Sequence, residues 1–226
     1  LVGFSIGYVM SSVSLLLRKP IERIIVLAVS TPEMLGGYII LSRLAELVGL
    51  LGTALSSGFM PIIIRRYHDA DGVGQVLARK LLDGYFALSM LLTAGALILW
   101  PLYLDDVPLP PNYPTTPILF LLVAANIFIG GSALSGQGFV LTQKGYFVGV
   151  AGAILVACLC AFGALFVLLG FGIWAAPLGL LVAAAIYIFL IVQGSERLAP
   201  AGYSSWRQFG WMTSLIVLSL AIGQGF

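Results

Sequence analysis

The chain has 226 residues, of which 60% are hydrophobic and 9% are charged, and its mean hydropathy is +1.08. This composition excludes an ordinary water-soluble domain and is typical of a protein with several membrane-spanning helices. The net charge of +2 is too small to indicate a nucleic-acid partner. We therefore expect an all-α polytopic membrane protein.

Seven apolar segments are long enough to cross a bilayer, since each span needs about 20 residues. They cover residues 3–29, 36–64, 82–104, 117–141, 145–169, 172–193 and 209–226. An alternative division places a loop at residues 18–23, but its next span would contain Thr31-Pro32-Glu33, which is typical of a break between helices. Because the sequence starts at Leu1 and stops inside an apolar run, we expect a part of a longer polypeptide.

Basic residues follow every second segment. They are Arg65, Arg66, Arg79 and Lys80 around a polar loop, then Lys144, then Arg197 and Arg207. The other connections hold Glu33, Asp105 and Asp106, and no Lys or Arg. Because Lys and Arg accumulate on the cytoplasmic side, this pattern predicts a cytoplasmic N-terminus.

The first segment carries four charged residues on one side. Arg18, Lys19, Glu22 and Arg23 fall within an arc of about 140° on a helix. Pro20 predicts a local kink. Ionisable groups at membrane depth mark a path for substrate or ions. These residues suit an anionic head group or a gating network of ion pairs; the alternative is a purely structural role.

The second segment carries a polar stripe. Ser42, Glu46, Gly49, Thr53, Ser56 and Ser57 fall within about 100° of one another, with Arg43 at the edge. The stripe is either a cavity wall or a packing seam, and Glu46 favours the cavity. Arg43 and Glu46 stand at i,i+3 and either pair with each other or with the first segment.

The fourth segment places Asn126, Gly130, Ala133 and Gln137 on one face. Amides both donate and accept hydrogen bonds and so suit sugar hydroxyls, although they also join helices to one another. Small residues at four-residue spacing predict close helix packing, at Gly145, Gly149 and Ala153 and again at Gly179 and Ala183.

The sequence carries no signature of an enzyme. It lacks a phosphate-binding glycine loop, a nucleophile elbow and the spacing of a metal site. His68 stands alone in a polar segment, while Cys158 and Cys160 point to different sides of one helix. We therefore expect no catalytic residue, no metal site and no cofactor.

The order of these features resembles the second six-helix lobe of polysaccharide-biosynthesis flippases. These are the O-antigen and lipid-linked oligosaccharide translocases of the multidrug/oligosaccharidyl-lipid/polysaccharide (MOP) superfamily. The resemblance rests on stretches such as RKPIERIIVLAVSTPEMLGGY, on helix order, and on loose positions: Glu22-Arg23, Gly37-Tyr38, Pro61, Tyr113 and Ala175-Ala176. The chain departs from the family at Glu22, where members usually have Asp.

The resemblance implies a two-lobe transporter with a V-shaped cationic cavity, in which residues 1–200 form a C-terminal-type six-helix lobe. Residues 201–226 would be a loop and the start of an additional transmembrane helix, and the N-terminal lobe is absent. Arg18, Lys19, Arg23 and Arg43 would bind the diphosphate of a lipid-linked oligosaccharide. Four further residues would line or gate the cavity: Glu22, Glu46, Asn126 and Gln137. The implied setting is the bacterial cytoplasmic membrane, with membrane lipids, the other lobe and a polysaccharide polymerase as partners.

Three other functions stay open. A drug/cation antiporter of the same superfamily would favour carboxylates in the cavity, whereas four cations face two acids here. A membrane glycosyltransferase or polymerase would need large outer loops, and the longest here is Pro-rich with only Asp105 and Asp106 to offer. A scaffold that assembles glycan enzymes is also compatible with the sequence.

Overall fold

The structure, a computed structural model, describes residues 2–67, 73–103, 109–110, 113–200, 210 and 214. Throughout these ranges the regular structure is helical, and none of the residues lies in a β-strand. The elements are α1 (Val2–Val29), α2 (Pro32–Arg66), α3 (Val73–Tyr103), α4 (Thr115–Ser135), α5 (Gln137–Leu141), α6 (Tyr146–Leu168), the short 3₁₀ helix η2 (Gly172–Trp174) and α7 (Ala175–Leu198).

Four stretches of helix are long and apolar enough to cross a membrane: Pro32–Arg66, Thr115–Leu141, Tyr146–Leu168 and Gly172–Leu198. The prediction of a helical fold is therefore confirmed for the described residues, and the four apolar helices fit a membrane protein. The seventh predicted segment falls almost entirely outside the described residues, and the count of six spans in one lobe of two stays a prediction.

The first connection lies at Ser30 and Thr31, so the alternative division of the sequence is wrong. Helix α1 runs unbroken through residues 18–23, with Pro20 inside it. Thr31 caps α2, because its hydroxyl accepts a hydrogen bond from the Met34 amide at 3.4 Å. Pro32 takes the first helical position, where a missing N–H costs nothing.

The predicted polar loop at residues 65–80 is shorter than expected. Helix α2 continues to Arg66 and α3 begins at Val73. Arg79 and Lys80 therefore lie on α3 and not in a loop. The reason is that apolar Val76, Leu77 and Ala78 extend the helical pattern, and Ala78 is fully buried.

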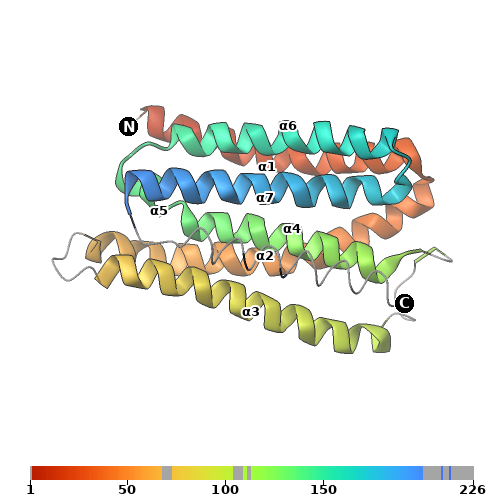
Figure 1. Cartoon of the computed structure of the whole chain (residues 1–226), viewed down its shortest axis with the longest axis horizontal. Coiled ribbons are helices and arrows are strands. Elements are labelled where there is room, and N and C mark those ends of the chain that lie inside the picture. The colour runs from red at the N-terminus through yellow and green to blue at the C-terminus, as the bar shows by residue number, and fades with distance from the viewer. Residues whose placement is uncertain are drawn as a thin grey trace.

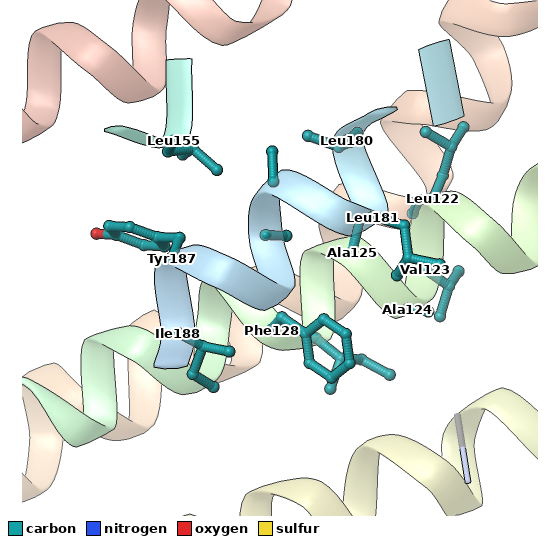
Figure 2. Close-up of a cluster of buried hydrophobic side chains, with 14 of the residues drawn as sticks. Leu122, Val123, Ala124, Ala125, Phe128, Leu155, Leu180, Leu181, Tyr187 and Ile188 are labelled. Carbon is teal, nitrogen blue, oxygen red and sulfur yellow. The ribbon is translucent and has the colours of Figure 1, made fainter. Parts of the chain in front are cut away.

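Two pairs of helices, each made of two helices that run parallel, lie on either side of α7. Helix α1 packs against α6 and α2 against α4, while α7 contacts both α4 and α6 (Figure 1). The core lies between α4 and α7, where Leu122 and Phe128 meet Leu180 and Ile188 (Figure 2). Helices α1 and α2 meet near their short connection and diverge toward the opposite end of the bundle (Figure 1). This divergence creates the groove described below.

Glycine pairs allow three of these helix crossings. A Cβ added to Gly149 would stand 2.7 Å from the carbonyl oxygen of Gly7, which joins α6 to α1. A Cβ on Gly179 would stand 2.9 Å from the backbone nitrogen of Gly163, which joins α7 to α6. The predicted close packing at Gly149 and Gly179 is thus confirmed. Gly52 meets the backbone of Gly130 in the same way, where α2 crosses α4.

Replacing Gly52 with Ala is expected to lower the free energy of unfolding by about 1–3 kcal/mol, since the new methyl group would force α2 away from α4. Gly58→Ala is the matched control: it lies on the same helix, and nothing stands within 4 Å of its added Cβ. The control should raise stability by about 0.5–1 kcal/mol, because it stiffens the unfolded chain. Thermal unfolding of the purified protein in detergent measures both, and equal effects would contradict the assigned crossing.

Candidate functional site

Polar side chains on three helices reach the same depth in the bundle. Arg18 precedes the end of α1 by eleven residues, Arg43 follows the start of α2 by eleven, and Asn126 follows the start of α4 by eleven. At 1.5 Å per residue each lies about 16 Å from the same end of the bundle. For α2 and α4, two of the helices long and apolar enough to cross a membrane, this is about half the thickness of a hydrocarbon layer of about 30 Å.

The centre of the site is a buried ion pair. Arg18 Nε lies 2.9 Å from Glu22 Oε1, one turn further along α1. Arg18 is 4% exposed and Glu22 is 2% exposed. Tyr38 on α2 donates a hydrogen bond from its hydroxyl to Glu22 Oε2 at 2.9 Å. A charge buried this deeply is tolerated only with such partners, so the pair also ties α1 to α2.

Asn126 extends the centre to α4. Its Nδ2 donates to the carbonyl oxygen of Leu122 at 2.8 Å, which turns the amide oxygen toward Arg18. Arg18 Nη1 donates to that oxygen at 3.5 Å, the long end of the hydrogen-bond range. Asn126 therefore binds the guanidinium of Arg18 and joins α4 to α1. Joining helices is one of the two roles that the sequence allows for this amide.

Glu46 gathers the outer cations. Its Oε2 lies 2.9 Å from Lys19 Nζ and 3.6 Å from Arg43 Nη1, and its Oε1 lies 3.7 Å from Arg18 Nη2. The side chains become more exposed outward: 18% for Glu46, 36% for Lys19 and 63% for Arg43. Of the two alternatives considered for Arg43 and Glu46, pairing with each other and pairing with α1, both occur at Glu46.

Arg23 completes the cluster from α1. Together with Lys19, Glu22, Ser42 and Arg43 it lines a polar pocket of about 10 Å³, which holds about one water molecule. Within the part of the chain that the structure describes, no carboxylate lies within ion-pair distance of Arg23. We call these residues the charge cluster: Arg18, Lys19, Glu22, Arg23, Arg43 and Glu46. Its four cations and two carboxylates leave an excess of two positive charges.

Gln137 lies on α5, outside α4, so its predicted face shared with Asn126 stays a prediction. Helix α4 ends at Ser135 and a new short helix, α5, begins at Gln137, which interrupts the regular spacing. Gln137 is 3% exposed, and its Nε2 lacks a hydrogen-bond partner within the described ranges. It is a buried residue of the core near the other end of the bundle.

Tyr38 is the functional residue that the sequence interpretation missed at this site. It had been noted only as part of the family resemblance. Its spacing carried the signal, because Tyr38, Ser42 and Glu46 follow i, i+4, i+8 and therefore share a face of α2. A hydroxyl that shares a helix face with one carboxylate, two turns away, is a candidate hydrogen-bond partner for a carboxylate on the adjacent helix.

A groove of about 430 Å³ runs between the diverging parts of α1 and α2. Its walls are α1 and α2, and its floor is formed by α4 and α7. Thr53 and Ser56 of the predicted polar stripe line the groove, so this part of the stripe is a cavity wall. Gly49 of the same stripe instead packs against Asn126. We call it the hydroxyl groove, after Tyr8, Ser11, Ser12, Thr53, Ser56, Ser132 and Tyr187.

Comparison of the chain with protein-family models, curated proteins and solved structures finds no match. Among the described residues, no group of three or more His, Cys, Asp or Glu side chains could hold a metal ion. Cys158 and Cys160 are free thiols on α6. The charge cluster and the hydroxyl groove are the two candidate sites of the chain.

Proposed function

We propose that this chain is part of a membrane transporter that moves an isoprenoid-diphosphate-linked oligosaccharide across the bilayer. The observation that carries the proposal is the exposure of Arg43, 63%, at a depth where lipid would surround it. A charge exposed at the middle of a membrane-spanning helix faces a wet path or a partner, because contact with hydrocarbon is too costly. The excess of positive charge favours an anionic ligand there.

A diphosphate fits the chemistry of the exposed cations. Arginine binds phosphate oxygens in a bidentate manner and keeps its charge in all conditions, while lysine adds a compact charge. Lys19, Arg23 and Arg43 are the residues that we assign to the ligand. Arg18 is withdrawn from that predicted set, because it is buried and engaged by Glu22, Glu46 and Asn126.

Apolar side chains of α1 and α2 offer a surface for the prenyl tail. Leu16, Leu47 and Leu50 are each more than 60% exposed near the charge cluster. A tail lying on this surface stays in lipid while the diphosphate reaches the cations. A second six-helix lobe would close the other side of the path, and rocking of one lobe against the other would exchange access.

The antiporter alternative is less favoured, because both carboxylates already have cations. Glu22 is held by Arg18 and Tyr38, and Glu46 contacts three basic side chains. A cationic drug would have to displace these partners. An anionic ligand meets Lys19, Arg23 and Arg43, of which only Lys19 and Arg43 share the carboxylate of Glu46.

The bacterial cytoplasmic membrane and a polysaccharide polymerase partner belong to the same proposal. The orientation follows from charge. Arg66, Lys144 and Arg197 lie at one end of the bundle, with the N-terminus of α1, whereas Glu33 lies at the other (Figure 1). By the positive-inside bias the basic end faces the cytoplasm.

Cysteine labelling tests this orientation. In a background with Cys158 and Cys160 replaced by Ala, Glu33→Cys is expected to react with a membrane-impermeant maleimide in intact cells. Lys144→Cys should react only after the membrane is opened. The reverse pattern would contradict the cytoplasmic placement of the basic end.

Binding of undecaprenyl diphosphate tests the function itself. The purified chain in phosphatidylcholine nanodiscs is expected to bind this lipid and to bind it less tightly at high salt, since the contact is ionic. Undecaprenol, which shares the tail and lacks the diphosphate, is the control and should bind at least tenfold more weakly. Equal affinity for the two lipids would overturn the proposed anionic ligand.

A further inference from the structure

The hydroxyl groove has the size and lining of a ligand site that differs from the charge cluster. Its volume of about 430 Å³ falls in the range of about 300–1,000 Å³ found for small-molecule pockets. Hydroxyl groups from α1, α2, α4 and α7 line it, together with apolar side chains such as Leu15, Met60 and Ile129. None of its lining residues is Asp, Glu, Lys or Arg.

The hydrogen bonds of the groove leave capacity for a ligand. Ser56 donates to the carbonyl oxygen of Ala133 at 3.0 Å and Ser132 to that of Ile129 at 2.6 Å, so both hydroxyl oxygens remain as acceptors. Ser11 lines the groove, and its hydroxyl makes no hydrogen bond with any other described residue. This hydroxyl can therefore both donate to and accept from a polar group in the groove.

We propose that the hydroxyl groove binds an uncharged sugar ring of the transported ligand. A sugar both donates and accepts hydrogen bonds, as the serine and threonine hydroxyls do, and its C–H faces pack on apolar side chains. This inference rests on the proposed function, because it places the sugar next to the diphosphate. A charged sugar finds no counter-ion in the groove, so the site selects uncharged sugars.

The spacing along the helices supports a single ligand that reaches both places. Ser12 precedes Lys19 by seven residues on α1, and Thr53 follows Glu46 by seven on α2. Both intervals correspond to about 10 Å along a helix axis. The first sugar attached to a diphosphate held by Lys19 and Arg43 therefore lies within reach of the groove.

Three probes test the inference on the full chain in nanodiscs made without glycoside detergents. They are undecaprenyl diphosphate, the same lipid carrying one N-acetylglucosamine, and octyl glucoside, which has a sugar and no diphosphate. The sugar-bearing diphosphate is expected to bind about tenfold more tightly than the bare one, a difference of about 1.4 kcal/mol. Ser11→Ala combined with Thr53→Val should remove this difference and leave the affinity for the bare diphosphate unchanged.

Thr93→Val is the matched control, because Thr93 is a buried hydroxyl residue on α3, outside the groove. It should preserve the preference for the sugar. The inference is overturned if the unmodified chain binds both diphosphates equally, or if the groove variant weakens both alike. Binding of octyl glucoside that depends on Ser11 and Thr53, without any binding of the bare diphosphate, would support the sugar site and overturn the proposed function instead.

Discussion

Arg18→Ala is expected to lower the free energy of unfolding by about 3–5 kcal/mol, the typical cost of removing one partner from a buried ion pair. The loss would leave Glu22, 2% exposed, with only the Tyr38 hydroxyl as a close partner. It would also free the amide oxygen of Asn126. Unfolding of the purified protein in mixed micelles, followed by circular dichroism, gives the measurement.

Two variants separate this effect from a general sensitivity to charge. Arg43→Ala removes the same guanidinium from an exposed position in the same cluster and should cost less than about 1 kcal/mol. Arg18→Met combined with Glu22→Gln removes both buried charges and should recover most of the stability lost in Arg18→Ala. A loss in Arg43→Ala as large as that in Arg18→Ala would show that burial does not decide the cost.

The second large effect is a pair of opposite changes in affinity for undecaprenyl diphosphate. Arg43→Gln removes an exposed cation and is expected to weaken binding about tenfold, which corresponds to about 1.4 kcal/mol. Glu46→Gln removes the carboxylate that now occupies Lys19 and Arg43, so it should strengthen binding by a similar factor. On the proposed function, Glu46 would compete with the ligand's anion for the same two cations.

Arg65→Gln is the control for this pair, since Arg65 is an exposed cation on the same helix, at the end of the bundle. It should leave the affinity nearly unchanged. Titration at fixed salt distinguishes the outcomes. Weaker binding in Glu46→Gln would mean that Glu46 organises the cations and does not compete with the ligand.

Much of the charge cluster could be predicted from sequence, because charged residues are rare in an apolar chain. The 100° step of a helix was enough to place Arg18, Glu22 and Arg23 on one side of α1. The same step placed Glu46 on the polar stripe of α2. The break between the first two helices also followed from local signals at residues 31–33, although α2 begins at Pro32, four residues before the predicted segment.

The different environments of like residues could not be predicted in this way. Arg18 and Arg43 have the same side chain at the same depth, yet one is 4% exposed and the other's side chain 63%. That difference depends on the neighbours of each side chain, since Arg18 meets Asn126 of α4, a segment far apart in the chain. Asn126 illustrates the same point, since its spacing showed which face it shares but not which guanidinium it meets.

The uneven packing of α1 and α2 has a mechanical consequence. The two helices are fastened to each other mainly through Lys19–Glu46 and Tyr38–Glu22, whereas along their length each is packed against a different neighbour, α6 or α4. A change in the width of the hydroxyl groove that keeps these bonds is therefore a scissor motion with the charge cluster as its pivot. In such a motion the cations stay nearly still while the serine-lined walls swing, so the hold on a ligand's sugar would loosen before the hold on its charge.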